Sequence, residues 1–232
     1  MAVMEATKDL IPVLDHGFVR LDDCMASDLS VVNAARVSFA QHSDELSVRD
    51  QGLIRFLMRE KHSSPFEHSV FRFHIKCPIF VAREWMRHRN SYNEWSARYS
   101  QLEPEFYVPE PEDVRTQVGK PGAYSFEPVD AELAEHTREV QREAYQHAYQ
   151  TYEMLLERGV AKELARNVLP VGIYTMFYWT VNARSLMNFL SLRNAEAAQR
   201  EIHRFAEAVE QLFAERMPHT HAAFIAADRR AP

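Results

Sequence analysis

The amino-acid sequence predicts an α+β fold, in which a small, mainly antiparallel sheet packs with long helices. Short segments at 17–21, 69–77 and 171–181 are rich in alternating apolar residues or in β-branched and aromatic residues, and they predict the strands. Segments with helical apolar periodicity lie between them, the longest over 131–158. The chain has 232 residues, 46% of them hydrophobic. This is enough for a sizeable core, and we expect a single domain over 1–232.

The first part of the chain predicts one strand and two helices. Residues 17–21 alternate as a strand does, and Ser27 or Asp28 is placed to cap a helix over 29–37. A second helix is predicted over 44–61. Its expected apolar face consists of Leu53, Ile54, Phe56, Leu57 and Met58.

The strand at 69–77 leads into the most polar part of the chain. Its apolar residues alternate with polar ones, and Pro78 ends the strand and opens a helix over 79–86. Continued by one residue, this helix would place Arg83 and Arg87 on one face, four residues apart. Like charges at that spacing repel each other unless an anion lies between them, so the pair favours a bound anion.

The segment 103–130 differs from its surroundings in composition. It contains five prolines and two glycines, and this content predicts a long loop over the surface. The helix over 131–158 follows and ends at Gly159, where a glycine is a common helix terminator. A short helix is expected at 162–169. Recurrent apolar residues predict that the long helix is amphipathic, and they are Leu133, Val140, Ala144, Ala148, Met154 and Leu155.

The last part of the chain predicts a buried strand and two helices. The strand at 171–181 is followed by a helix over 182–193 and by a final helix over 196–216. The final helix turns Ile202, Phe205, Val209, Leu212 and Phe213 inward.

Residues 87–100, which we call the arginine segment, contain three arginines, a histidine and a glutamate, with almost nothing aliphatic. Such a segment is a poor candidate for a structural element and a good candidate for an anion site. Arginine offers a planar fork of donors that matches the oxygens of phosphate and carboxylate groups. The alternative is a solvated polar loop, which is the usual meaning of a charge run.

Composition limits the class of protein. The net charge of −6 argues against a protein that coats nucleic acid. Neither glycine-rich phosphate-binding motif is present, so arginine side chains would have to bind phosphate. No signal peptide and no apolar run of about 18 residues is found, so we expect a soluble, cytoplasmic protein. Cys24 and Cys77 suit a reducing compartment as free, structural thiols.

Several segments together resemble the flavin-dependent thymidylate synthase family. Arg87-His88-Arg89, followed after Asn90 by the ten residues 91–100, is similar to the family's R-H-R, spacer, S-x-N-E-x-S-x-R-Y-S signature. The resemblance extends from about residue 15 to 225. The flanking segments that share it are 64–68, 78–83 and 179–189.

Two positions depart from the family pattern. The family usually has two residues between R-H-R and the following serine, whereas this chain has only Asn90. Glu84 stands where relatives often carry glutamine. A carboxylate beside a phosphate-bearing nucleotide would need protonation or a neighbouring cation. We therefore expect Glu84 either to be protonated or to lie next to a cation.

The resemblance implies the reductive methylation of dUMP to dTMP for dTTP biosynthesis. The carbon donor would be 5,10-methylenetetrahydrofolate, and NADPH-reduced FAD would supply the hydride. Arg193 and His62 match the positions implied to be catalytic. A guanidinium near N3 and O4 of uracil would stabilise the charge that develops when carbon 5 acts as a nucleophile. The resemblance also implies a homotetramer with shared active sites, small-molecule partners only, and neither a nucleic-acid polymer nor a membrane.

The implied ligand residues form two sets. The residues implied to bind dUMP are Glu84, Arg87, Glu94, Ser96, Ala97, Arg98, Arg166 and Arg193. The residues implied to bind FAD are Ser64, Arg87, His88, Arg89, Glu94, Asn182, Arg184 and Asn188. His219 and His221 give only a weak indication of metal binding, and we expect no metal site.

Two alternative functions remain open at this point. The first is a nucleotide-sensing or RNA-binding protein, which would use the arginines of the arginine segment for phosphate and Tyr92, Trp95 and Tyr99 for base stacking. The second is a flavoenzyme that acts on nucleotides without folate. The colour of the purified protein and the folate dependence of its reaction distinguish these alternatives.

Overall fold

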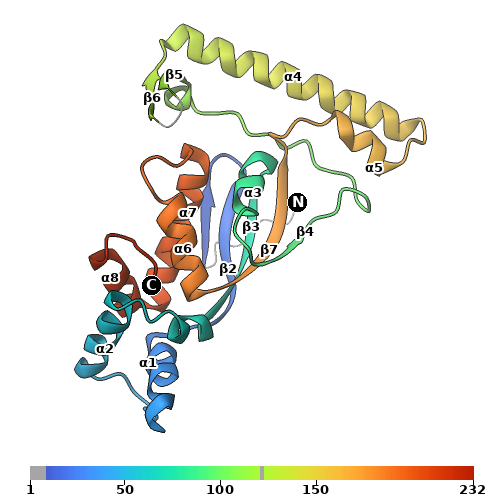
Figure 1. The fold of residues 1–232 in the computed structure, drawn as a ribbon. Coiled ribbons are helices and arrows are strands. Elements are labelled where there is room, and N and C mark those ends of the chain that lie inside the picture. Colours follow the sequence, from blue (N-terminus) through green and yellow to red (C-terminus); the bar gives the residue numbers. More distant parts are fainter. Residues whose placement is uncertain (1–8, 121–122) are drawn as a thin grey trace. The chain divides into compact units, whose positions relative to one another are not determined.

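The computed structural model describes residues 9–120 and 123–232, which divide into two compact units (Figure 1). Of these described residues, the sheet unit comprises 9–77, Val81–Glu94 and Thr175–Pro232. The second, which we call the α4 unit, comprises Pro78–Phe80 and Trp95–Tyr174.

A five-stranded sheet organises the sheet unit, with strand order β1-β2-β3-β7-β4. The pairs β1–β2, β2–β3 and β4–β7 are antiparallel, which confirms the predicted mainly antiparallel sheet. Between β2 and β3 the register shifts once, between Leu21 and Asp23. The strands are β1 (Leu10–Val13), β2 (Gly17–Met25), β3 (Val70–Pro78), β7 (Tyr174–Asn182) and β4 (Ser91–Glu94).

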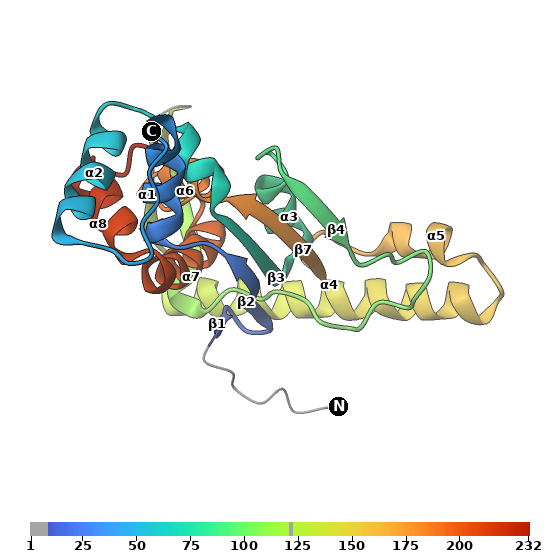
Figure 2. The ribbon, with the colours of Figure 1, turned by 90° about the horizontal axis from the view of Figure 1, so that it is seen from below.

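Alternation along the strands produces the core. In β3 the side chains of Phe71, Phe73 and Ile75 are fully buried, whereas the intervening Arg72 is exposed. Successive residues of a strand point to opposite faces, so one face of the sheet is apolar. The helices α6 (Ala183–Arg193) and α7 (Arg200–Arg216) lie against this sheet in Figure 2.

Aromatic side chains fill the space between the sheet and these helices. Trp85, at the end of α3 (Ile79–Trp85), is fully buried, and its ring centroid lies 4.8 Å from that of Phe189 on α6 and 5.2 Å from that of Trp179 on β7. Phe205 of α7 contacts the same tryptophan at 6.0 Å. Buried aromatic pairs of this kind add stabilisation beyond their buried area. The end of α3 is thereby fixed against the sheet and both helices.

The first helices form at the N-caps provided by Ser27 and Ser47. The Ser27 hydroxyl accepts the N–H of Ser30, and α1 (Asp28–Arg36) begins there, as predicted. Helix α2 (Val48–Arg59) begins four residues later than predicted, because the Asp50 carboxylate accepts the N–H of Ser47 at 2.8 Å and defines the first turn. The predicted inward residue Phe56 is 42% exposed.

Helix α8 (Pro218–Ala226) was not predicted from the sequence, and neither was β1. The buried Asp28 carboxylate accepts the backbone N–H groups of His219 and Thr220 at 2.9 and 2.8 Å. It therefore satisfies the free donors at the start of α8 from a position about 190 residues earlier in the chain. Helix α7 starts four residues later than predicted, at Arg200.

The α4 unit is built on one long helix. Helix α4 (Ala131–Glu157) begins where the Asp130 side chain accepts the N–H of Leu133 at 2.8 Å, and Gly159, with φ of 81°, follows its end. Helix α5 (Lys162–Ala165) and the 3-10 turn η4 (Arg166–Val168) together replace the predicted helix at 162–169.

The sequence predicted a loop over the whole of 103–130, but the structure contains regular elements in this segment. It contains the 3-10 turn η3 (Pro111–Asp113) and an antiparallel hairpin of β5 (Arg115–Lys120) and β6 (Ala123–Pro128). The hairpin strands are exposed, apart from Arg115. Pro128 at the end of β6 and Gly119 within β5 are residues that argue against strands in a sequence, so the pairing was not predicted.

The apolar side of α4 is largely exposed. Leu133, Val140 and Met154 are 46%, 49% and 38% exposed, while Ala134 and Tyr152 are the buried residues of this helix. A small apolar cluster elsewhere in the α4 unit contains Ala97, Leu102 and Ile173, with Ile79, Trp95, Phe106 and Leu169 packed around it.

Among the residues that the structure describes, no helix is both long and apolar enough to cross a membrane.

Candidate functional site

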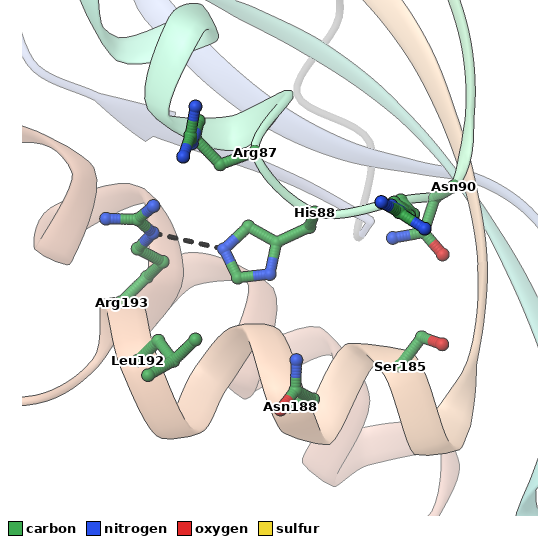
Figure 3. A pocket seen from close by; sticks show the side chains of 8 residues that line it. Arg87, His88, Asn90, Ser185, Asn188, Leu192 and Arg193 are labelled. Atoms are coloured by element: carbon green, nitrogen blue, oxygen red, sulfur yellow. Dashed lines mark hydrogen bonds between the residues drawn. The ribbon is translucent and has the colours of Figure 1, made fainter.

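The sheet unit contains a pocket of about 400 Å³ between a turn and one face of α6 (Figure 3). This volume lies within the range of small-molecule sites. The turn follows α3 and contains most of the pocket's positive charge. The lining residues are Arg87, His88, Arg89, Asn90, Ser185, Asn188, Leu192 and Arg193.

The turn is held by hydrogen bonds to its backbone. The N–H groups of Arg87 and His88 donate to the carbonyls of Glu84 and Trp85 at 3.3 and 3.0 Å. The Tyr92 hydroxyl donates to the carbonyls of Trp85 and His88 at 3.0 and 2.8 Å. Burial raises the pKa of Tyr92 to about 12, so this hydroxyl keeps its proton and remains a donor.

Two expectations for the arginine segment were wrong. Residues 91–94 do form a structural element, because β4 pairs with β7 at the edge of the sheet, with Ser91 opposite Thr180. Helix α3 ends at Trp85, so Arg87 lies in the following turn and does not share a helix face with Arg83. The two guanidinium groups are therefore not held together by helix geometry.

Helix α6 contributes the opposite side of the pocket. Asn182 caps its start by accepting the N–H of Ser185 at 2.9 Å. The residues Ser185, Asn188 and Leu192 recur at intervals of three and four and therefore lie on one face. The opposite face is anchored in the core by Leu186, Met187, Phe189 and Leu190, all with no exposed surface.

Arg193, the last residue of α6, is held by three hydrogen bonds. Its Nε donates to Nε2 of His88 at 3.1 Å. One terminal nitrogen donates to the Glu84 carboxylate at 3.1 Å, and the other donates to the Glu84 backbone carbonyl, also at 3.1 Å. A guanidinium carries five N–H donors, so one donor on each terminal nitrogen is left for a ligand.

Burial shifts the pKa values of the two side chains that contact Arg193. Burial, with a smaller contribution from the Arg193 cation, lowers the pKa of His88 to about 4, so the imidazole is neutral at physiological pH. Burial also raises the pKa of Glu84, and Arg193 opposes this shift. Arg193 is therefore a cation next to Glu84, which is one of the two conditions predicted for a carboxylate at this position.

The structure brings four of the eight predicted flavin residues to this pocket: Arg87, His88, Arg89 and Asn188. The others lie elsewhere in the sheet unit. Ser64 is an exposed residue of the 3-10 turn η2 (Ser64–His68), which packs against α6. Arg184 reaches the same turn, 3.8 Å from the Glu67 carboxylate, and Asn182 is occupied as the cap of α6. Glu94 accepts the Thr175 hydroxyl at 2.8 Å.

His62, predicted to be catalytic, does not line the pocket. It is exposed after the end of α2, where its ring contacts that of Phe56 edge to face at a centroid distance of 5.6 Å. The preceding residue, Lys61, has a φ of 56°, in the left-handed region. The chain thus turns sharply just before the imidazole.

The predicted dUMP residues are divided between the two units. Glu84, Arg87, Glu94 and Arg193 belong to the sheet unit, whereas Ser96, Ala97, Arg98 and Arg166 belong to the α4 unit. The sequence alone did not predict this division.

Within the α4 unit, residues 96–100 form a compact turn. The Ser96 carbonyl accepts the N–H groups of Tyr99 and Ser100 at 3.0 and 3.3 Å. Arg98 pairs with Glu163 of α5 at 2.9 Å, which places two predicted ligand regions of this unit next to each other. The predicted ligand residue Ala97 has its methyl group in the apolar cluster, so only its backbone is available to a ligand.

The three aromatic residues proposed for base stacking are not equivalent. Tyr92 is fixed by its two hydrogen bonds, and Trp95 is partly buried and donates to the Ser100 hydroxyl. Only Tyr99, at 78% exposure, presents a free ring. A stacking platform for successive bases needs several exposed rings, so the structure does not favour the RNA-binding alternative.

Both cysteines are free and behave as structural residues. Cys77 is fully buried in β3, and burial raises the pKa of its thiol well above the usual value. Burial also raises the pKa of Cys24. Neither thiol has the lowered pKa expected of a nucleophilic cysteine.

Three pocket residues were missed as site residues: Asn90, Ser185 and Leu192. Helical periodicity could have identified two of them, because Ser185 and Leu192 lie three residues before and four residues after Asn188. Asn90 was noted only as a shortened spacer. Its position in the pocket depends on the path of the turn.

The chain is similar over most of its length to one group of proteins. A family model described as thymidylate synthase complementing protein (Thy1) matches residues 20–219. A flavin-dependent thymidylate synthase from Thermotoga neapolitana is 51% identical over 217 residues, covering 93% of this chain and 94% of that protein. One from Tropheryma whipplei is 50% identical over 219 residues, covering 89% and 91%.

Solved structures show the same likeness. A UMP/dUMP methylase from Streptomyces cacaoi, crystallised with 5-Br dUMP, superposes with a TM-score of 0.87 at 44% identity, and the match covers 96% of this chain and all of that chain. Its complex with 5-Br UMP superposes with a TM-score of 0.86.

Proposed function

This chain belongs to the flavin-dependent thymidylate synthase family, and from that membership we propose how its residues divide the work of the reaction. The reaction is the reductive methylation of dUMP to dTMP, with 5,10-methylenetetrahydrofolate as the carbon donor and NADPH-reduced FAD as the hydride source. The observation that supports the division most directly is the pocket in which Arg87, His88 and Arg89 face Asn188 and Arg193 of α6.

The donor set of this pocket fits FAD. Arginine forks suit the diphosphate, and the amide of Asn188 with the imidazole of His88 suits the polar edge of the ring system. When bound, the flavin carries the redox chemistry of the reaction. The protein's part is to bind and orient it. We assign Ser64, Asn182 and Arg184, around the start of α6 and the η2 turn, to the same cofactor.

Arg193 is assigned to the nucleotide. Its two remaining N–H donors can contact the uracil edge, where they would stabilise negative charge that develops at N3 and O4. Because Glu84 and His88 already hold the guanidinium, it need not reorganise during the reaction. Ser96, Arg98 and Arg166 of the α4 unit complete the dUMP set in this proposal, with Glu94 at the end of β4.

His62 is assigned to proton relay or to tuning of the flavin. Its exposure leaves the imidazole accessible to ligands. His62, whose side chain is exposed in the structure, would join the site when the substrates bind.

We also propose that the protein is a homotetramer with shared active sites. The exposed Leu133, Val140 and Met154 of α4 give an apolar stripe that a second copy of the chain would cover. The cytoplasm is the proposed compartment, because it would keep Cys24 and Cys77 as free thiols.

The release of tritium from carbon 5 of labelled dUMP tests the function. We expect release that requires FAD, NADPH and 5,10-methylenetetrahydrofolate together, with dTMP as the product. Unchanged release without the folate would show that the protein is a flavoenzyme of another type. Protein that is colourless and cannot be reconstituted with FAD would contradict the assignment at an earlier step.

A further inference from the structure

The two ring nitrogens of His88 have different surroundings. Nε2 accepts the Nε–H of Arg193 at 3.1 Å, whereas Nδ1 lies on the other side of the ring, toward the space beside Asn188 (Figure 3). Within the part of the chain that the structure describes, Nδ1 has no hydrogen-bond partner. The residue is 8% exposed, and its ring packs edge to face against Phe189 at a centroid distance of 5.0 Å.

The contact with Arg193 determines which nitrogen carries the proton. A guanidinium has donors only and does not lose its proton in proteins, so Nε2 must offer its lone pair. A neutral imidazole has one N–H, which is therefore on Nδ1. Protonation of Nε2 would place two N–H groups and two positive charges against each other. The lowered pKa of His88, near 4, agrees with this arrangement.

We propose that Arg193 holds His88 as the neutral Nδ1–H tautomer, so that His88 presents one hydrogen-bond donor to the pocket. The matching group on the ligand is an acceptor, either a carbonyl oxygen or an unprotonated ring nitrogen. Its identification as part of the flavin ring rests on the proposed function. Arg193 then has two roles: it faces the nucleotide, and as a positioning residue it sets the donor that faces the cofactor.

His74 provides an opposite case in the same molecule. There the Arg20 guanidinium lies 3.0 Å from Nδ1, so Nδ1 accepts and the proton belongs on Nε2. The ring is stacked on Tyr178 at a centroid distance of 4.8 Å. The two histidines are thus predicted to be opposite tautomers, each imposed by one arginine.

Nitrogen-15 NMR of histidine-labelled protein without added ligand tests the tautomer directly. Ring proton to nitrogen correlations at pH 7 should show Nδ1–H for His88 and Nε2–H for His74, with the signals assigned by the variants His88→Gln and His74→Gln. Arg193→Met should release His88 from this tautomer and raise its pKa, while His74 stays unchanged. The matched variant Arg20→Met should have the reverse selectivity.

The unchanged His74 signal in Arg193→Met shows that the fold is retained. A charged or Nε2–H form of His88 in the wild-type protein at pH 7 would overturn the proposal. So would an Nδ1–H form that persists, with an unchanged pKa, after Arg193→Met, because the tautomer would then have another cause.

The ligand side is tested with two amides of different reach. His88→Asn places an amide N–H close to the position of Nδ1, whereas His88→Gln carries its amide to the position of Nε2, next to Arg193. In an FAD titration we expect Asn to keep the dissociation constant within roughly threefold, and Gln to raise it roughly tenfold, as the loss of one hydrogen bond would. Equal losses in both variants would overturn the donor role.

The two proposals can fail separately. Wild-type protein that binds no FAD would contradict the proposed function and the flavin as the ligand. The His88 spectrum of the free protein would still decide the tautomer, because no ligand is present in that measurement.

Discussion

Arg193 connects the two sides of the proposed site through its own hydrogen bonds. The sequence placed it at the end of a helix, where an arginine is an ordinary favourable cation. In the structure its three fixed contacts involve Glu84 and His88, which lie more than a hundred residues earlier in the chain. Its surroundings therefore depend on tertiary packing and not on a local sequence pattern.

Arg193→Ala should lower the rate of dTMP formation by about 10²–10³-fold while the protein still binds FAD at saturating concentration. The guanidinium is proposed to act on the charge of the uracil ring, and loss of one such electrostatic group typically costs about 10²–10³ in rate. Product formation and flavin absorbance of the same preparation should be measured. Loss of FAD with normal turnover of the remaining holoenzyme would reverse the assignment.

Glu84→Gln should leave activity within a few-fold of wild type, whereas Glu84→Ala should lower it by about 10–100-fold. Glutamine keeps an oxygen that accepts from Arg193, and alanine does not. Because burial raises the pKa of Glu84, the folded state disfavours its charge, so Glu84→Gln should not lower the unfolding midpoint at pH 7. Steady-state kinetics and thermal melts check both parts. Equal activity of the two variants would exclude a positioning role.

Glu210→Gln should destabilise the protein by about 1.5–3 kcal/mol at pH 7, because a buried hydrogen-bonded carboxylate is lost. The Glu210 carboxylate accepts from His221 and Arg229 at 2.8 and 3.0 Å and from the Asn194 amide. Burial alone would raise its pKa, but these partners outweigh burial and lower the pKa to about 2.

The lowered pKa of Glu210 also predicts the pH range of the effect. The carboxylate's contribution is complete above its usual pKa, near 4.5, and is lost as the pH falls toward 2. The stability difference between wild type and Glu210→Gln should therefore shrink between pH 4.5 and 2 in denaturant titrations. Glu215→Gln, an exposed position on the same helix, is the control and should change stability by less than about 0.5 kcal/mol. A difference that does not vary with pH would contradict the assignment.

At the scale of elements, local patterns predicted the elements whose own residues show a clear apolar periodicity. Alternation in 69–77 identified β3, and periodicity between Asp130 and Gly159 identified α4 nearly to its ends. The elements that were missed depend on distant partners: β4 exists because β7 lies beside it, and α8 begins on the Asp28 carboxylate. Short segments of this kind carry no periodic signal of their own.

Two glycine substitutions should change the stability of the protein with opposite signs, one through strand packing and the other through helix propensity. Gly17→Ala should destabilise the protein, because a Cβ at this first residue of β2 would lie 2.6 Å from the Val13 carbonyl of β1 and 2.8 Å from the Lys76 carbonyl of β3. Gly52→Ala in α2 meets nothing within 4 Å and should stabilise by up to about 1 kcal/mol, the helix propensity difference. Chemical denaturation measures both. A neutral Gly17→Ala would contradict the described strand packing.

At the scale of the whole molecule, one apolar face of α4 is exposed instead of being covered by other parts of the described chain. Leu133 and Val140 follow a helical apolar pattern and are nevertheless 46% and 49% exposed. Sequence periodicity states which face is apolar but not what covers it. The proposed homotetramer supplies a covering surface in a second copy.

The double variant Leu133→Glu with Val140→Glu should shift the proposed homotetramer to smaller species. Charged side chains on an apolar interface cost several kcal/mol on burial, so association should weaken. Light scattering after size exclusion measures the mass, and Glu132→Gln on the same helix is the control. A tetramer unchanged at micromolar concentration would show that this face is not an interface.

The sequence by itself determined the family and the reaction class, because these depend on side-chain chemistry repeated at fixed spacing. The α+β class and the main helices were likewise determined by local periodicity. Only the tertiary structure decided that Arg193 would donate to His88 and pair with Glu84, and that Ala97 would be buried. Hydrogen-bond partners and burial arise between segments distant in sequence, and no local pattern specifies which segments will meet.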